Sequence, residues 1–300
     1  MTLALLFPGQ GSQSVGMGKA LCEASEPART VFEEADRVLG FPLSKLCFEG
    51  PEEELRRTAN TQPAILTHSI AALADLRARH PEKLEGAVFA AGHSLGEYSA
   101  GVAVGAFSFA DAVALVRARG TYMQEAVPAG VGAMAAIVGL APDAVDAACR
   151  EAAQGETVAP ANYNSPEQTV IAGHAAAVAR ASEACLARGA KRAIALPVSA
   201  PFHCALMSPA RDRMKPFLEA TVFTDAAVPV VTNVDAAPET SGERLRDALV
   251  RQIDSPVRWV ETVQRLAREG VDRALEIGPG NVLAGLVRRI EKSIKVEGHA

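Results

Sequence analysis

The chain has 300 residues, of which 49% are hydrophobic, and a formal net charge of -5. This length and composition can bury a large core, so we expect one sizeable domain or a domain with an insert. Basic and acidic residues are mixed and no basic stripe interleaves with aromatic residues, which argues against nucleic-acid binding and favours a metabolic enzyme. No apolar run approaches the roughly 18 residues that a membrane span needs.

The cysteines and the first residues indicate where such an enzyme works. Five cysteines are dispersed without a C-x-x-C pair, which indicates neither a disulfide framework nor a zinc site. Residues 1–8 are apolar but lack a basic start, and Pro8 and Gly9 interrupt them, which favours a first buried strand over a signal peptide. We expect a cytoplasmic enzyme with no metal site and no bound cofactor.

Strand-like and helix-like segments alternate in the first part of the chain, as is typical of an α/β fold with a mostly parallel sheet and helices on both faces. Ser108 and Asp111 form a capping box that marks the start of one helix. The elements expected in this part are strands at 3–7 and 87–91 and helices at 28–38, 62–79 and 108–125.

A different order of elements occupies residues 130–198, with the β-α-β-β-α-β succession of a ferredoxin-like unit. Its expected strands and helices are 133–138, 142–153, 158–162, 168–172, 175–188 and 192–197. The chain then returns to the main sheet, with expected elements at 209–218, 228–232, 243–253, 256–268, 273–277 and 281–290. The predicted domains are an α/β hydrolase-like catalytic core, residues 1–128 and 199–300, and a ferredoxin-like inserted subdomain, residues 129–198.

The pentapeptide Gly92-His93-Ser94-Leu95-Gly96 follows an apolar strand and precedes a helical stretch, Glu97 to Val104. This context predicts a nucleophile elbow that exposes the Ser94 hydroxyl at the carboxyl end of a sheet. The helix N-terminus just after Ser94 places partial positive charge where an oxyanion would form. By itself the pentapeptide also fits a plain turn.

A serine nucleophile needs a base, and histidine is the usual one. His93 adjoins Ser94, but in an elbow its side chain should point away. His203 lies where the chain re-enters the main domain, which makes it the candidate base. No Asp or Glu stands out as its partner, which favours a Ser-His dyad held by a carbonyl. The other four histidines are expected to be structural or solvated: His68, His80, His174 and His299.

The loop after the first strand and Arg119 each allow more than one interpretation. The loop after the first strand, Gly9 to Gln13, lacks the third glycine of a dinucleotide fingerprint, because Ser14 stands in its place. A P-loop ending at Gly18-Lys19 is excluded as well, because Gln13 stands where a glycine is required. The loop can still present a backbone N–H as the second donor of an oxyanion hole. Arg119 is either a solvated helical residue or a guanidinium that turns inward to bind a substrate carboxylate.

With these residues assembled, the chain resembles the malonyl-CoA:acyl carrier protein transacylases of bacterial type II fatty-acid synthesis and, more distantly, the acyltransferase domains of polyketide synthases. The resemblance covers nearly the whole length. The segments that carry it are 7–13, 61–64, 91–98, 119–120, 123–126, 132–136, 162–166, 203–207 and 276–280.

The resemblance implies ping-pong transfer of a malonyl group from malonyl-CoA to the phosphopantetheine thiol of an acyl carrier protein, which docks transiently. It implies a role for each of these residues: Ser94 as nucleophile, His203 as base, Leu95 and Gln10 as oxyanion donors, Gln252 as the carbonyl that orients the base, Arg119 as the malonyl carboxylate site, and Met123 and Asn162 near the acyl pocket. Phe202 before the base resembles malonyl-selective polyketide domains, which implies preference for malonyl over methylmalonyl. Neither nucleic acid nor membrane is implied as a partner.

Alternative functions remain at this point. A serine esterase or thioesterase would share the dyad but pass the acyl group to water. A polyketide pathway would use the same reaction. A carrier-protein docking module would keep the fold with an unreactive Ser94.

Overall fold

The computed structural model describes residues 2–198 and 200–300. The larger of its two sheets has six strands in the order β10-β9-β1-β2-β7-β8. Every pairing is parallel except that of the edge strand β8 with β7, which confirms the mostly parallel α/β sheet. The strands are β1 (Leu3–Phe7), β2 (Ala87–Gly92), β7 (Val230–Val231), β8 (Pro238–Glu239), β9 (Arg273–Ile277) and β10 (Lys295–His299).

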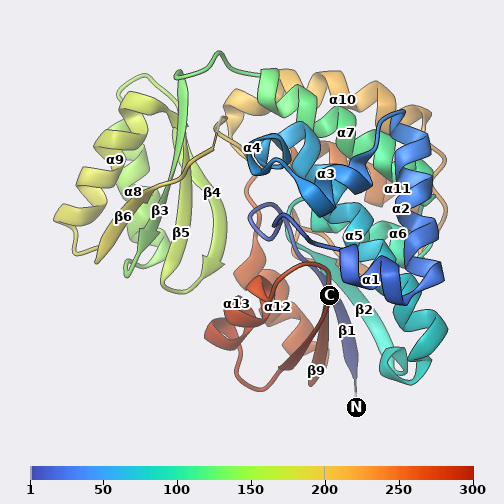
Figure 1. Ribbon diagram of the computed structural model, residues 1–300. Coiled ribbons are helices and arrows are strands. Elements are labelled where there is room, and N and C mark those ends of the chain that lie inside the picture. Colours follow the sequence, from blue (N-terminus) through green and yellow to red (C-terminus); the bar gives the residue numbers. More distant parts are fainter. Residues whose placement is uncertain (1, 199) are drawn as a thin grey trace.

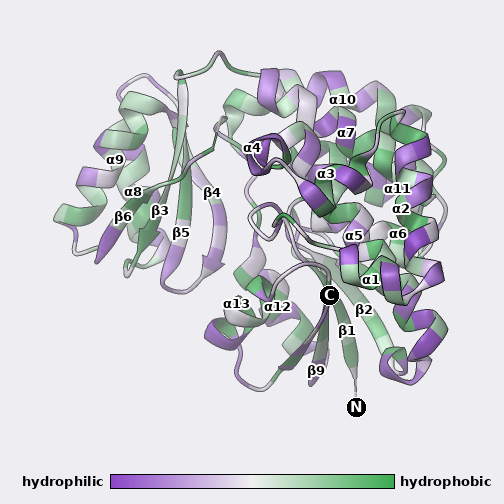
Figure 2. Ribbon diagram, in the orientation of Figure 1, coloured by the Kyte–Doolittle hydropathy of each residue, from purple (hydrophilic) through white to green (hydrophobic). Residues whose placement is uncertain are grey.

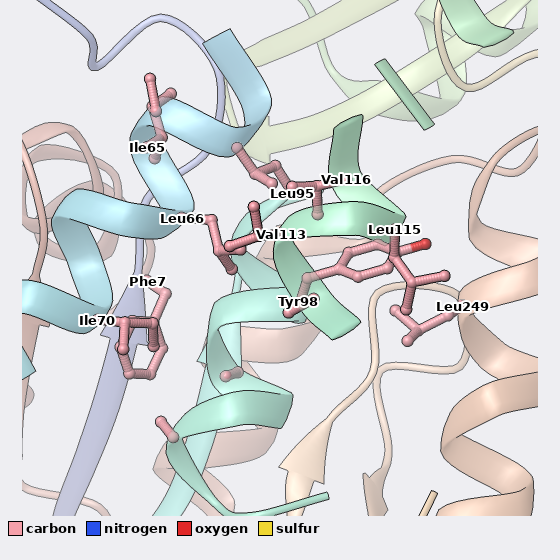
Figure 3. Packing of buried hydrophobic residues seen from close by; sticks show 14 of the residues in the cluster. Phe7, Ile65, Leu66, Ile70, Leu95, Tyr98, Val113, Leu115, Val116 and Leu249 are labelled. Carbon is pink, nitrogen blue, oxygen red and sulfur yellow. The ribbon is translucent and has the colours of Figure 1, made fainter. Parts of the chain in front are cut away.

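Strand β1 lies in the middle of this sheet, and its side chains alternate between two apolar layers. Leu3, Leu5 and Phe7 belong to the large core cluster on one face, whereas Ala4 and Leu6 belong to a second cluster on the other. Successive residues of a strand point to opposite faces, so a continuous apolar run means that both faces are covered. Figure 3 shows part of the first cluster, to which Phe7 of β1 and Ile70 both belong.

Helices cover the two faces unequally. On the face that carries Ala4 and Leu6, the sheet packs against two helices, α12 (Trp259–Arg268) and α13 (Val282–Ile290), which complete the second cluster. A thicker layer covers the other face and the end of the sheet (Figure 1). Figure 2 shows mostly green strands beneath helices that carry purple on their outer sides, as amphipathic helices should. The thicker layer contains α1 (Lys19–Ala24), α2 (Glu26–Leu39), α3 (Leu43–Glu49), α4 (Glu52–Arg56), α5 (Thr58–Arg79), α6 (Gly96–Ala103), α7 (Phe109–Glu125), α10 (Ser208–Ala220) and α11 (Gly242–Gln252).

A second sheet stands apart at the left of Figure 1. Its four antiparallel strands have the order β4-β5-β3-β6, and helices α8 and α9 pack on it through a separate apolar cluster. This order confirms the ferredoxin-like subdomain. Its elements are β3 (Gly132–Val138), α8 (Pro142–Ala153), β4 (Val158–Ser165), β5 (Gln168–His174), α9 (Ala175–Ala187) and β6 (Arg192–Ala195). The domain limits at 128/129 and 198/199 stay predictions, and residues 1 and 199, at which two predicted segments begin, lie outside the described residues.

The structure corrects several element bounds. Helix α12 begins at Trp259, not at 256, because Val257 pairs with the subdomain: its N–H donates to Ala161 and its carbonyl accepts from Tyr163. Strand β10 was not predicted, and it extends the sheet by pairing with β9. Short polar segments such as β10 acquire strand geometry only from a neighbouring strand. No helix within residues 2–198 and 200–300 is long and apolar enough to cross a membrane.

Candidate active site

Strands β1 and β2 run parallel and end side by side, so the turns after them meet at one edge of the sheet. The turn after β2 is a tight elbow in which Ser94 has a φ of 51°. A Cβ on Gly96 would lie 2.0 Å from the Phe7 carbonyl oxygen, and one on Gly92 would lie 1.9 Å from the Gly96 carbonyl carbon. Both flanking glycines are therefore required by close backbone contact, and Ser94 is presented at the start of α6.

The nucleophile and the base predicted from the sequence contact each other. Ser94 Oγ lies 2.7 Å from Nε2 of His203, which is 4% exposed. The other ring nitrogen, Nδ1, lies 2.9 Å from the backbone carbonyl oxygen of Gln252. A carbonyl can only accept, so Nδ1 carries the proton and Nε2 presents a lone pair to the Ser94 hydroxyl. Burial, and next the Arg119 charge, lower the pKa of His203 to about 3, which keeps the ring neutral.

Arg119 turns inward from α7, contrary to the solvated alternative, and is 1% exposed. Its Nη1 donates to Gln62 Oε1 at 2.8 Å, and its Nη2 donates to Gln252 Oε1 at 2.8 Å and to Ser94 Oγ at 3.2 Å. The guanidinium carbon lies 5.6 Å from the centre of the Tyr98 ring. No carboxylate of the described chain lies within ion-pair distance of it. A buried cation held only by neutral groups is suited to an anionic ligand.

Ser94, His203 and Arg119 face a cavity of about 120 Å³. Seven of the nine residues that the sequence proposed line it: Gln10, Ser94, Arg119, Met123, Asn162, Phe202 and His203. Gln252 joins the site through its hydrogen bonds. Leu95 is buried in the core and does not line the cavity (Figure 3). Among the described residues, no hydrogen bond occupies the backbone N–H of Leu95 or of Gln10, so both donors are free to bind an acceptor.

The subdomain supplies the opposite wall. Met134 on β3 and Asn162 on β4 line the cavity together with Leu196 and Val198, which follow β6. Of these four residues, only Asn162 has a role predicted from the sequence. The other three are ordinary apolar residues of strands and their ends, and nothing in their local pattern distinguishes a cavity wall from a core.

His93 also lines this cavity. Its Nε2 lies 2.8 Å from Asn164 Oδ1 of β4, and its ring lies 5.6 Å from that of Trp259. It has no hydrogen bond to Ser94 or His203 among the described residues. The histidine of the elbow therefore contacts the subdomain, although it opens onto the same cavity as the nucleophile.

A buried polar network lies beneath the elbow and was not predicted from the sequence. Asn233 accepts from the Ser94 N–H at 2.7 Å through Oδ1 and donates to the Gly92 carbonyl at 2.7 Å through Nδ2. Gln252 Nε2 donates to the Ser94 carbonyl at 2.9 Å and to Glu97 Oε2 at 2.8 Å. Burial raises the pKa of Glu97 to about 7, against the lowering effect of its hydrogen bonds. The network holds the backbone of Ser94 through both its N–H and its carbonyl.

The remaining nucleophilic groups are not part of the site. Cys204 follows the base, but its Sγ donates to the Pro201 carbonyl at 3.1 Å, and burial raises its thiol pKa to about 11. All five cysteines are buried free thiols. Within the described residues, no group of three or more His, Cys, Asp or Glu side chains is arranged to hold a metal ion.

Comparison with known proteins gives concordant matches. Residues 4–298 match the family model described as acyl transferase domain. The chain is 52% identical over 287 residues to a malonyl CoA-acyl carrier protein transacylase of Escherichia coli K12, covering 96% of this chain and 92% of the relative. It superposes with a TM-score of 0.95 on an acyl carrier protein S-malonyltransferase of Vibrio cholerae, at 48% identity and with 99% and 96% of the two chains covered. An equal TM-score, with 49% identity and the same coverage, relates it to a malonyl-transacylase solved in complex with its type II polyketide acyl carrier protein.

Proposed function

The chain belongs to the acyl transferase domain family, and we propose that it carries a malonyl group on Ser94 between malonyl-CoA and acyl carrier protein. It is an [acyl-carrier-protein] S-malonyltransferase of fatty-acid synthesis. One observation carries the proposed mechanism: the Ser94 hydroxyl lies between a neutral histidine nitrogen at 2.7 Å and a buried guanidinium at 3.2 Å. A nucleophile, its base and a site for an anion thus meet in one cavity.

The first half-reaction forms an ester on the serine. His203 Nε2 takes the Ser94 proton as Oγ attacks the malonyl thioester carbon, and the resulting imidazolium is stabilised by the Gln252 carbonyl at Nδ1. The tetrahedral intermediate collapses with cleavage of its C–S bond, and the CoA thiol leaves with the proton from His203. The unoccupied backbone N–H groups of Leu95 and Gln10 are the proposed oxyanion donors, each contributing on the order of a few kcal/mol.

The second half-reaction reverses these roles. The phosphopantetheine thiol of the carrier protein gives its proton to His203 and attacks the malonyl ester carbon. Ser94 Oγ leaves and recovers the proton. The carrier protein is therefore a transient partner, and water is a competitor that the site must exclude. These steps need no cofactor or metal ion, because serine, histidine and backbone groups supply every proton and charge.

Arg119 is the proposed site for the free malonyl carboxylate. A buried guanidinium without an acidic partner gains a charge-assisted pair when that carboxylate enters, whereas an acetyl group offers it nothing. Met123 and Asn162 are proposed to shape the acyl pocket that they line. The five buried thiols fit the proposed cytoplasmic location, since a reducing compartment keeps them free.

Phe202 is the proposed determinant of acyl size. Its ring is 8% exposed and lines the cavity beside the base, where it leaves little room for a methyl branch. With equal amounts of malonyl-CoA and methylmalonyl-CoA, the protein should load malonyl preferentially, and Phe202→Ser should narrow the preference by about tenfold. Competition assays read by mass spectrometry measure both. Equal loading of the two groups on the unmodified protein would contradict this role.

Intact-protein mass spectrometry tests the function directly. Malonyl-CoA should add one malonyl group to the protein, and the adduct should map to Ser94. Adding the phosphopantetheinylated carrier should move the group to the carrier thiol. Ser94→Ala should reduce loading by at least about a thousandfold. Rapid loss of the adduct to water without the carrier would instead support a thioesterase, and an unreactive Ser94 would support a docking module.

A further inference from the structure

The guanidinium of Arg119 must be held in one orientation if it is to bind the malonyl carboxylate. The residue is 1% exposed, and no acid of the described chain forms an ion pair with its guanidinium. Long cationic side chains have many rotamers, so a carboxylate site needs groups that hold the guanidinium in place before substrate arrives. Two amide oxygens, Gln62 Oε1 and Gln252 Oε1, hold it here at 2.8 Å each.

Gln252 can hold Arg119 only if its amide is oriented with the oxygen toward the guanidinium. The opposite orientation would place the NH2 group against a cation. The amide nitrogen of Gln252 donates at 2.9 Å to the Ser94 carbonyl, at 2.8 Å to Glu97 Oε2 and, at the longer distance of 3.5 Å, to Asn233 Oδ1. All three partners are acceptors, so all three favour the orientation that Arg119 needs. Of the two side-chain acceptors, Glu97 is the nearer.

The Glu97 side chain is held in place by burial and by a second hydrogen bond. It lies in the first turn of α6, is 2% exposed, and also accepts from the backbone N–H of Asn233 at 3.1 Å through the same Oε2. Its other oxygen, Oε1, has no hydrogen-bond partner among the described residues. Within the described chain, the hydrogen bonds of its carboxylate thus go to the two residues beneath the elbow, Gln252 and Asn233. A helix cap or a surface ion pair would not explain that arrangement.

We propose that Glu97 is a positioning residue for malonyl recognition: by accepting from Gln252 it orients the amide that holds Arg119 toward the acyl cavity. The backbone N–H of Glu97 donates to the Ser94 carbonyl at 3.1 Å, but within the described chain its carboxylate has no hydrogen bond to Ser94 and does not line the cavity, so the carboxylate acts through Gln252. This inference rests on the proposed malonyl transfer through Ser94 and adds an acidic residue to a site whose histidine is oriented by a carbonyl. An oxygen acceptor is what the role requires, and a glutamine at position 97 retains one.

The test measures the ratio of malonyl to acetyl loading on Ser94 for the full chain with each acyl-CoA. Glu97→Met keeps the length of the side chain but removes the acceptor, and the ratio should fall about tenfold, as expected for loss of one hydrogen bond to a charge-bearing network. Glu97→Gln should stay within about twofold of the unmodified protein. Glu97→Asp, which keeps an acceptor but draws it back by one carbon, should give an intermediate ratio.

Glu276 provides a matched control. It is also fully buried, and its two oxygens accept from the backbone N–H groups of Leu283 and Ala284 at 2.9 and 2.7 Å, away from the cavity. Glu276→Met should lower the melting temperature without changing the loading ratio. If Glu97→Met or Glu97→Asp lowered only the melting temperature, as this control does, Glu97 would be structural and the inference wrong.

A double variant separates this inference from the proposed function. In an Arg119→Ala background, Glu97→Met should lower the malonyl-to-acetyl ratio no further, because the residue through which it acts is gone. A second, additive fall would overturn the inference. Failure of the unmodified protein to form a malonyl-Ser94 adduct would overturn the proposed function instead.

Discussion

Two glycine-containing turns follow the strands on either side of β1, at 92–96 after β2 and at 278–280 after β9. Each opens a helix and each has a buried carboxylate close by, Glu97 at the first turn and Glu276 at the second. The two turns differ in which residues have a positive φ angle. In the second turn the positive φ angles, 141° and 79°, fall on Gly278 and Gly280, whereas in the elbow the positive φ of 51° falls on Ser94.

The two carboxylates differ in the same way. Glu276 accepts from two backbone N–H groups of α13 and so completes a helix start. Glu97 accepts from a side-chain amide that also contacts Ser94 and Arg119. A serine in the left-handed region costs roughly 1–2 kcal/mol relative to a glycine. One sheet edge therefore supports two kinds of turn: one in which glycines and a helix start give stability, and one in which a strained backbone and buried polar groups hold Ser94.

Substituting one glycine of each turn by alanine should show whether the turn requires glycine because of close contacts or because of its positive φ. Gly96→Ala places a Cβ 2.0 Å from a backbone oxygen, so we expect a loss of more than about 3 kcal/mol in unfolding free energy, or no soluble protein. At Gly280 the nearest atom lies 3.9 Å away and only the φ of 79° opposes a side chain, so Gly280→Ala should cost about 1–2 kcal/mol. Urea unfolding measures both. Equal losses would remove the distinction between the turns.

The proposed carboxylate site predicts that Arg119→Ala reduces malonyl loading but not acetyl loading. Malonyl loading should fall on the order of 100-fold, since a buried charge-assisted contact is lost, while acetyl loading should hold or rise. Single-turnover loading with each acyl-CoA measures the change. Arg77→Ala is the control, because Arg77 donates at 2.7 Å to the Ala103 carbonyl at the far end of α6 and does not line the cavity. Unchanged malonyl loading in Arg119→Ala would exclude the carboxylate site.

The smallest effect concerns pH. With the pKa of His203 lowered to about 3 by burial, the base stays neutral, so malonyl loading should change less than about twofold from pH 5 to 8. Between about 3 and 6.5 the unfolded chain binds the additional proton, so the contribution of this histidine to stability is complete above 6.5 and decreases as the pH falls toward 3. Stopped-flow loading and urea unfolding across this range test the two statements. An acid limb with a midpoint near 6.5 in the loading rate would show a base exposed to solvent.

Sequence patterns predicted much of the fold and part of the candidate site. Strand periodicity predicted the ferredoxin-like subdomain within a few residues at each element, because its strands and helices carry clear local patterns. The elbow was predicted from an apolar strand followed by flanking glycines, and the missing acid pointed to a carbonyl partner for His203. The particular carbonyl, that of Gln252, came from family resemblance, since a backbone oxygen has no sequence signature.

Other contacts could not be predicted, for physical reasons. Gln252 and Asn233 lie 158 and 139 residues from Ser94 in the chain, and an amide in a helix or after a short strand gives no local sign of what it contacts. Gln62 was noted within a family segment but given no role. Its bond to Arg119 depends on how α5 packs against α7. The start of α12 was misplaced because Val257 pairs with a strand of the subdomain.

The sequence by itself determined the elbow that presents Ser94 and the α/β architecture with an inserted antiparallel unit, because apolar periodicity and glycine spacing act over a few residues. Only the tertiary structure decided that Arg119 is buried, that the two sheets enclose one cavity, and that Glu97, Asn233 and Gln252 join beneath Ser94. Hydrogen bonds between buried side chains depend on where distant segments meet, and that position is set by packing of the whole core.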